Sequence, residues 1–302
     1  MINMYKLTHA QAREAVINIR RVIHSYFQDN NITYAIFGKS EGLDSSVVAG
    51  LLSGISGIKP IGVLMPCESN PEAARIARLV LEQYNIPWIQ VDLTEELHAL
   101  TALYYSTDSV QDQLSKIVQD DISYKTMIQR KARAIGNIKA RLRMITLYHI
   151  AQLTGGLVIS TDNLSELWMG FWTLNGDVGD LAPIQHVWKG LELYTIAEVL
   201  GVPKESLEAI PTDGLDVVPG GVDEDQLGLP YPELDRVIVS LLQNKYDGTQ
   251  DNALIEVIAA ETGCTVDAVA HVAHRITNTN FKRHWPRVIA RTETGLLDIE
   301  TL

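Results

Sequence analysis

The sequence predicts an α/β fold in which helices flank a doubly wound parallel sheet. In the first ninety residues, short apolar strand patterns alternate with helical patterns in the order β, α, β, α, β. The turn after the first strand, residues 38–46, contains Gly38 and Gly42 and leads directly into a helical run. Ligands of such sheets bind beyond the carboxyl ends of the strands, where this turn and the segment after Met65 both emerge.

The pattern of apolar residues places the individual elements. Ala15, Ile19, Val22, Ile23 and Tyr26 recur at helical spacing and predict an amphipathic helix before the first strand. The predicted strands are 33–37, 60–65, 87–92 and 157–159. The predicted helices are 9–29, 45–52, 72–84, 137–152 and 191–200, and the chain after residue 232 is mainly helical.

Three segments lack a clear period. Residues 104–135 are polar and predict a mobile connector, and residues 161–189 predict loops and short turns at the carboxyl edge of the sheet. Residues 213–230 belong to a stretch rich in Gly, Pro and acidic residues, which predicts a mobile flap. We expect residues 1–302 to form a single domain.

The composition limits the classes of protein to which this chain can belong. With 302 residues, of which 46% are hydrophobic, the chain has ample material for one substantial core. A formal charge of −12 argues against a nucleic-acid partner, because affinity for a phosphate backbone comes mainly from Lys and Arg. Cys67 and Cys264 form no CxxC motif, and no signal peptide or long apolar span is evident. We therefore expect a reduced, cytoplasmic protein with no membrane partner.

The turn after the first strand has the chemistry of a pyrophosphate cradle. Backbone N–H groups at a helix start lack intrahelical acceptors and lie at the positive end of the helix dipole, so they favour phosphate oxygens. The hydroxyls of Ser40, Ser45 and Ser46 can add donors. Asp44 stands beside them, and a carboxylate next to a phosphate site usually shares a divalent cation with it. The loop predicts ATP with Mg²⁺.

The motifs resemble those of a known family. Ser-x-Gly-x-Asp-Ser after a strand resembles the PP-loop of the ATP pyrophosphatases, and no Gly stands five residues before Gly38 as a Walker A loop requires. Residues 161–166, 170–173, 176–177 and 180–184, together with Asn137 to Met144, resemble the signature of ammonia-dependent NAD synthetases. The resemblance covers nearly the whole chain and implies an adenine nucleotide α-hydrolase-like, Rossmann-like fold.

The resemblance also implies a reaction and a homodimer. Such an enzyme adenylates the nicotinate carboxylate of deamido-NAD with ATP, releases pyrophosphate, and lets ammonia displace AMP to give NAD. Matching motif positions would place Asp44, Glu166 and Lys189 in catalysis, with Asp44 and Glu166 holding Mg²⁺. The ATP site would contain Gly38, Lys39, Ser40, Glu41, Gly42, Leu43, Asp44, Ser45, Thr161, Lys189 and Thr212, and the acid substrate would contact Arg141, Asp180 and Lys282.

The chain departs from the family pattern at Glu41, where Gly is usual, at Leu174, where Lys is usual, and at Phe281, where His is usual. A carboxylate within about 5 Å of a phosphate costs roughly 1 to 3 kcal/mol unless Mg²⁺ or Lys39 compensates it. Two alternatives therefore stay open. One is a divergent paralogue that adenylates and amidates another carboxylate, and the other is a catalytically impaired nucleotide-binding regulatory protein.

Overall fold

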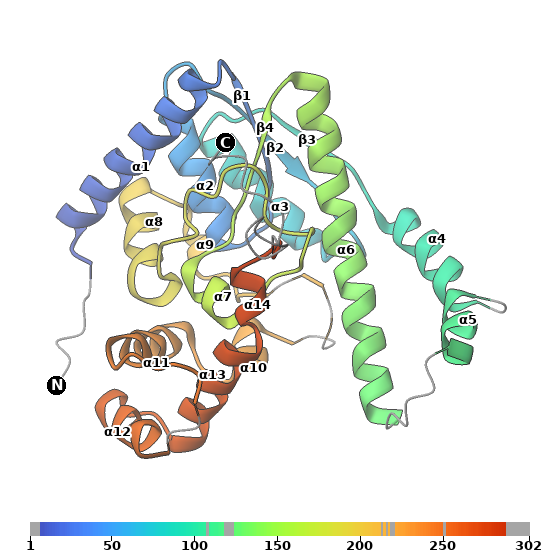
Figure 1. Ribbon diagram of the computed structural model, residues 1–302. Coiled ribbons are helices and arrows are strands. Elements are labelled where there is room, and N and C mark those ends of the chain that lie inside the picture. The colour runs from blue at the N-terminus through green and yellow to red at the C-terminus, as the bar shows by residue number, and fades with distance from the viewer. Residues whose placement is uncertain are drawn as a thin grey trace, which may run out of the picture.

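The computed structural model describes residues 7–106, 109–117, 124–212, 214–215, 217, 221–249 and 252–287. In this part of the chain, four parallel strands form one sheet in the order β3-β2-β1-β4 (Figure 1). They are β1 (Tyr34–Gly38), β2 (Lys59–Leu64), β3 (Trp88–Gln90) and β4 (Leu157–Ile159). The predicted doubly wound α/β sheet is confirmed, and each predicted strand is present to within two residues at either end.

The strand order places a switch point between β1 and β4. The chain proceeds from β1 to β2 to β3 in one direction and then crosses back, so that β4 pairs with the other side of β1. The loops that leave β1 and β4 therefore diverge to opposite sides, which opens a crevice at their carboxyl ends. Residues 38–43, Thr161 and Asp162 line that crevice.

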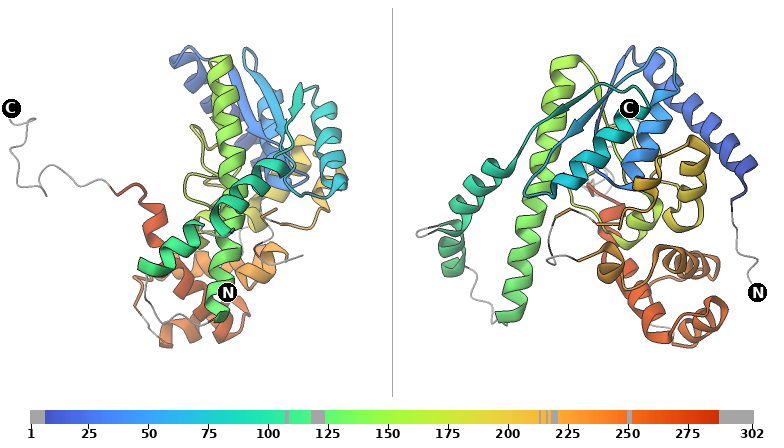
Figure 2. Two further views of the ribbon diagram at one scale, coloured as in Figure 1. Left: turned by 90° about the vertical axis from the view of Figure 1, so that its right-hand side faces the viewer. Right: turned by 180° about the vertical axis from the view of Figure 1, so that it is seen from behind.

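Alternation along the strands supplies two apolar layers. Ala35 and Phe37 of β1 face the layer that contains α1 (His9–Asp29), α2 (Leu43–Ser53) and α3 (Pro71–Gln83), with α8 (Tyr194–Leu200). Ile36 faces the opposite layer, which contains α4 (Thr94–Tyr105) and α6 (Tyr124–Thr154). The helices seen on either side of the sheet in Figure 2 therefore cover both of its faces.

A separate cluster of helices lies below the carboxyl edge of the sheet in Figure 1. It consists of α11 (Tyr231–Gln243), α12 (Asn252–Thr262), α13 (Val266–Asn278) and α14 (Asn280–Arg283). Leu234, Ile238, Ile258 and Val272 are buried in its own apolar core, and α7 (Leu164–Met169) joins it through Met169. We name α11 to α14 the helical lobe. That residues 1–302 form a single domain stays a prediction.

The connector predicted for residues 104–135 is wrong in its secondary structure. Residues 110–117 form α5 (Val110–Ile117), and α6 begins at Tyr124 rather than at residue 137. The sequence argument required an apolar face, but the first half of α6 stands clear of the sheet (Figure 1), and its long charged side chains favour a helix without burial. Whether this segment moves stays a prediction.

Short helices complete the carboxyl edge, including α7 within the predicted loop region 161–189. The others are the π-helix η1 (Lys189–Leu193), α9 (Lys204–Leu207) and α10 (Asp223–Leu227). The predicted flap 213–230 thus contains a helix at 223–227, while residues 213, 216 and 218–220 lie outside the described residues. Among the described residues, no helix is both long and apolar enough to cross a membrane.

Candidate functional site

The loop after β1 lies at the switch point and ends at the start of α2. Gly42 is the N-cap residue of α2, with extended backbone angles and no side chain to cap the first turn. The first N–H groups of α2 are therefore available to a ligand. The loop forms one wall of a cavity of about 1150 Å³, which continues past β4 to α6 and the helical lobe.

Lys39 lies beneath this loop rather than on its surface. Its side chain is buried, and its Nζ donates to the carbonyl of Ser40 and to the hydroxyls of Ser45 and Ser46, at 3.1 and 2.9 Å. Burial lowers the pKa of Lys39 to about 7, although Glu41 and Asp44 oppose the shift. Lys39 Nζ thus links Ser40, Ser45 and Ser46 from inside the turn.

The same loop is attached to α9. The hydroxyl of Ser46 donates to Ser206 Oγ at 3.0 Å, and Ser206 Oγ donates to the carbonyl of Glu41 at 2.8 Å. Glu41 lines the cavity and is half-buried, so its backbone is fixed by Ser206 while its carboxylate belongs to the cavity wall. The chain continues from α9 to Thr212, another lining residue.

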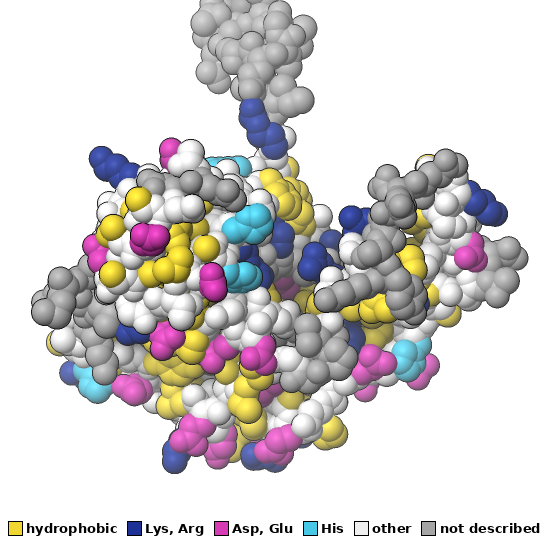
Figure 3. All heavy atoms as spheres, turned by 90° about the horizontal axis from the view of Figure 1, so that it is seen from below, with side chains coloured by type: hydrophobic (Ala, Val, Ile, Leu, Met, Phe, Trp, Pro, Cys, Tyr) yellow, Lys and Arg dark blue, Asp and Glu magenta, His cyan; other side chains and the backbone are white. Residues whose placement is uncertain are grey.

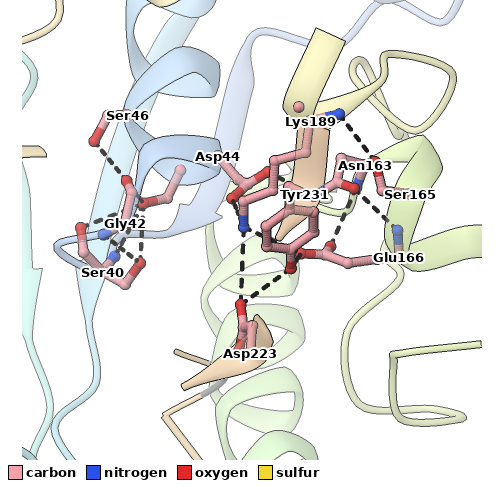
Figure 4. A network of polar contacts seen from close by, with 12 residues as sticks. Ser40, Gly42, Asp44, Ser46, Asn163, Ser165, Glu166, Lys189, Asp223 and Tyr231 are labelled. Carbon is pink, nitrogen blue, oxygen red and sulfur yellow. Dashed lines mark hydrogen bonds and ion pairs between the residues drawn. The ribbon is translucent and has the colours of Figure 1, made fainter. Parts of the chain in front are cut away.

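A buried lysine brings together carboxylates from three different segments (Figure 4). Lys189 Nζ lies 2.9 Å from Asp44 Oδ2, 3.5 Å from Glu166 Oε1 and 3.9 Å from Asp223 Oδ2. Burial lowers the pKa of Lys189, but these carboxylates outweigh it and raise the pKa well above its usual value. The ammonium group therefore stays charged throughout the working pH range.

Tyr231 of the helical lobe closes this cluster from the other side. Its ring lies 4.3 Å from Lys189 Nζ, and its buried hydroxyl donates to Glu166 Oε1 at 3.3 Å and to Asp223 Oδ2 at 3.1 Å. Burial raises the pKa of Tyr231 well above its usual value, and the neighbouring carboxylates add to the shift. The phenol is therefore a permanent donor to Glu166 and Asp223.

Local structure fixes the remaining atoms of Glu166 and Asp44. Asn163 caps α7 reciprocally, because its Oδ1 accepts from the N–H of Glu166 while Glu166 Oε2 accepts from the N–H of Asn163. Asn163 Nδ2 also donates to Asp44 Oδ1 at 2.8 Å. Burial raises the pKa of Glu166 well above its usual value, and Lys189 opposes this shift.

The donor set fits a magnesium ion that is shared with a nucleotide. Asp44 Oδ2 and Glu166 Oε1 already face a common cation, the Lys189 ammonium. Within the described residues no cluster of three or more metal-binding side chains occurs. Mg²⁺ at nucleotide sites needs only one or two carboxylates, because phosphates and waters complete its coordination.

The opposite end of the cavity is cationic, in a chain whose net charge is negative. Arg133 of α6, Arg275 of α13 and Lys282 of α14 all line it. Lys282 Nζ donates to the carbonyls of Gly170, at 2.7 Å, and of Trp172. Burial lowers the pKa of Lys282 to about 8, which Asp177 opposes and the two arginines reinforce. Figure 3 shows Lys and Arg side chains gathered inside the hollow of this face.

The structure brings almost all predicted site residues to this one cavity. Residues 38–45 of the loop line it, as do Thr161, Glu166, Lys189, Thr212, Arg141 and Lys282. Asp180 is the exception, because it is not among the described residues that line the cavity. Its Oδ2 accepts from the N–H of Val158 at 2.9 Å and its Oδ1 accepts from the hydroxyl of Tyr148 at 3.1 Å, so it holds the edge of β4. The structure therefore gives no support to the predicted substrate contact of Asp180.

Sequence reasoning gave no role to several residues of the site. Asp162 is buried in the cavity wall, and its Oδ2 has no hydrogen-bond partner among the described residues. Burial, reinforced by Asp177, raises the pKa of Asp162 to about 8. Tyr231 and Asp235 lie one turn apart on the buried face of α11, and neither belongs to a motif that the sequence analysis identified.

Comparison with known proteins agrees with the motifs. A family model described as NAD synthase matches residues 15–286. The NH(3)-dependent NAD(+) synthetase of Finegoldia magna is 34% identical over 224 residues, which cover 74% of this chain and 83% of that protein. The enzyme of the same description from Methanocaldococcus jannaschii is 30% identical over 280 residues, covering 91% and 96%.

Solved structures agree with the fold. An NMN synthetase from Francisella tularensis superposes with a TM-score of 0.68 at 22% identity, over 92% of this chain and 98% of that one. The NH3-dependent NAD synthetase of Campylobacter jejuni, in complex with a nitrate ion, gives a TM-score of 0.66 at 20% identity, over 92% and 99%.

Proposed function

The chain belongs to the NAD synthase family, and we propose that it adenylates the nicotinate carboxylate of deamido-NAD with ATP and then amidates it with ammonia. Its relatives make it an ATP-dependent carbon–nitrogen ligase of NAD biosynthesis. The observation that carries the finer proposal is the arrangement of the cavity. The loop after β1 and the carboxylate–lysine cluster line one part of it, and the cations Arg133, Arg275 and Lys282 line another.

In the first step, a carboxylate oxygen of the nicotinate ring attacks the α-phosphorus of ATP, and the bond to the bridging oxygen of pyrophosphate breaks. Both reactants are anions, so the step needs donors and cations around the phosphates rather than a protein nucleophile. The first N–H groups of α2 and the hydroxyl of Ser40 would bind the leaving pyrophosphate. The Lys189 ammonium would offset the charge that develops on it.

Asp44 and Glu166 would hold Mg²⁺, which supplies further neutralisation of phosphate charge when it is bound. Lys189 now occupies the space between these two carboxylates. We infer that Lys189 turns toward the phosphates when ATP binds and keeps Asp223 as its partner. Tyr231 would keep donating to Glu166 and Asp223 throughout.

In the second step, ammonia attacks the carbonyl carbon of the acyl adenylate. The carbon–oxygen bond to AMP breaks, AMP leaves with its electron pair, and a proton leaves the nitrogen to give the amide. The names of the relatives in the comparison support free ammonia as the donor. Arg141 and Lys282 would contact the anionic dinucleotide from the cationic end of the cavity.

A homodimer is also proposed. The outer face of α6 exposes Ile145 and Leu153, whose residues are 66% and 74% exposed, and a second copy would cover such residues. Sedimentation equilibrium of the purified chain measures the state directly, and a monomer at micromolar concentration would rule the proposal out.

One incubation tests the reaction. The purified chain is mixed with ATP, Mg²⁺, ammonium and deamido-NAD, and pyrophosphate and NAD are measured. Both products should appear in equal amounts. Pyrophosphate release with nicotinate mononucleotide or another acid, but not with deamido-NAD, would favour the divergent paralogue. ATP binding without pyrophosphate release from any acid would favour the regulatory protein.

A substitution at Glu41 gives a further test of these three functional hypotheses. Glu41→Gly removes a negative charge from the cavity wall beside the phosphate loop. We expect ATP to bind more tightly in this variant, by roughly 1 to 3 kcal/mol if no cation compensates Glu41 in the wild type. An unchanged ATP affinity would show that Lys39 or Mg²⁺ already neutralises the carboxylate.

A further inference from the structure

Asp235 and Ser165 connect the helical lobe to the two chain segments that present Glu166 and Lys189. Both side chains are fully buried. The hydroxyl of Ser165 donates to Asp235 Oδ1 at 2.5 Å, a short hydrogen bond to a carboxylate. Asp235 Oδ2 accepts from the N–H groups of Gly190 and Leu191, at 2.7 and 3.1 Å.

Ser165 also binds the second segment itself. Its Oγ accepts from the N–H of Lys189 at 3.0 Å (Figure 4). Its own hydrogen goes to Asp235. Ser165 immediately precedes Glu166, and Gly190 immediately follows Lys189. A closed set of hydrogen bonds therefore fixes the backbone beside both functional side chains.

The hydrogen bonds of Asp235 position the backbone and do not neutralise a charged side chain. Asp235 is paired with a hydroxyl and two backbone N–H groups, in a place where an unpaired carboxylate would be costly. Its partners come from α7 and η1, whereas Asp235 itself belongs to α11. Tyr231, one turn earlier on α11, reaches the Glu166 side chain directly. One face of α11 thus sets both the backbone and the carboxylate of Glu166.

We propose that Asp235, acting through Ser165, is the positioning residue that holds Glu166 and Lys189 in register for binding Mg²⁺-ATP. This inference rests on the proposed function of Glu166 and Lys189, and neither Asp235 nor Ser165 is among the residues that line the cavity. Groups that orient metal-binding and catalytic side chains from behind commonly matter nearly as much as those side chains.

Ser165→Ala is the test, and Ser240→Ala is its matched control. Ser240 is another fully buried serine, it lies on α11, and it donates to the carboxylate of Glu261 at 2.9 Å. Both variants remove a hydrogen bond from a buried serine to a carboxylate, but Glu261 is exposed on α12 and Ser240 does not line the cavity. Asp235→Asn is the second variant, because it keeps the volume while its amide cannot accept from both sides.

Two readouts are needed. The first is binding of ATP by calorimetry as a function of Mg²⁺ concentration, which requires no acid substrate and no turnover. The second is kcat and KM for amidation. For Ser165→Ala and Asp235→Asn we expect the Mg²⁺ concentration for half-maximal ATP binding to rise, and kcat to fall, by roughly 10-fold to 100-fold. The KM for the acid should stay within about twofold, and Ser240→Ala should leave every value unchanged.

The proposal is overturned if Ser165→Ala and Asp235→Asn bind ATP with the wild-type Mg²⁺ dependence. It is also overturned if Ser240→Ala weakens Mg²⁺-dependent ATP binding and lowers kcat as much as the two site variants do. The effect would then be general destabilisation. If the wild type amidates no acid but the Mg²⁺ dependence shifts in the two site variants alone, the proposed substrate fails while the positioning role stands.

Discussion

Replacing Lys39 with methionine should stabilise the protein more at pH 6 than at pH 9. The Lys39 ammonium is buried under the phosphate loop, 4% exposed, and its hydrogen-bond partners are the uncharged groups of Ser40, Ser45 and Ser46. Burial outweighs the opposing influence of Glu41 and lowers the pKa of Lys39 from 10.5 to about 7. Methionine keeps the unbranched shape but carries no proton.

The direction in which wild-type stability changes with pH follows from proton uptake by Lys39. Between pH 7 and pH 10.5 the unfolded chain binds a proton at Lys39 that the folded chain does not, so the stability of the wild type rises with pH in this window. Below pH 7 both states are protonated, and the full penalty of burying the charge applies. Each pH unit inside the window is worth about 1.4 kcal/mol, so wild-type stability gains roughly 2 to 3 kcal/mol from this group between pH 6 and pH 9.

Urea unfolding of wild type and Lys39→Met at pH 6 and pH 9 measures the effect. The difference in unfolding free energy between the two proteins should change by roughly 2 to 3 kcal/mol between the two pH values, and groups common to both proteins cancel. Lys39→Arg is the control, because arginine stays charged at both pH values. It separates the effect of losing the Lys39 hydrogen bonds from the effect of its titration. A methionine effect of the same size at pH 6 and pH 9 would refute the reasoning, because Lys39 would then titrate near its ordinary pKa.

Three further substitutions test the roles assigned to individual residues. Tyr231→Phe removes a hydroxyl that donates to Glu166 and should lower kcat by roughly tenfold without unfolding the lobe, which circular dichroism and steady-state kinetics together would check. Asp180→Ala should cost about 1 to 3 kcal/mol of stability and leave KM for the acid unchanged, and a raised KM would restore it as a substrate contact. Arg133→Met should raise the KM for deamido-NAD about tenfold, whereas Arg130→Met, on the same helix but outside the cavity lining, should not.

The sheet and its phosphate loop could be predicted because they depend on local patterns. Strands with two buried faces read as short apolar runs, and the shift to a helical period marks the turn at residues 38–46. The first half of α6 was not predicted as a helix, because it has no buried apolar face that would give a helical period. Its helical state rests on propensity, which is a weak signal in a segment rich in charged residues.

The candidate site was predictable only where a motif names the residue. Glu166 and Lys189 belong to segments whose residue order resembles a family, and the structure brings their side chains to 3.5 Å. Asp235 belongs to no quoted motif, and its partners lie 44 to 70 residues away, at separations where no periodicity can indicate contact. Burial of a carboxylate is a property of the folded chain, so its role required the structure.

The π-helix that begins at Lys189 makes the chain sensitive to length at this point. The N–H of Leu193 reaches back five residues to the carbonyl of Trp188, at 3.0 Å, so this turn contains one residue more than an α-helical turn. Deleting Leu191 would let the turn tighten and would rotate Lys189 by about 100° relative to α8. The ammonium group would leave Asp44 and Glu166 although every functional side chain remained. An insertion or deletion between residues 188 and 194 is therefore more damaging than most substitutions there, and homologous active enzymes should keep the spacing of this turn constant.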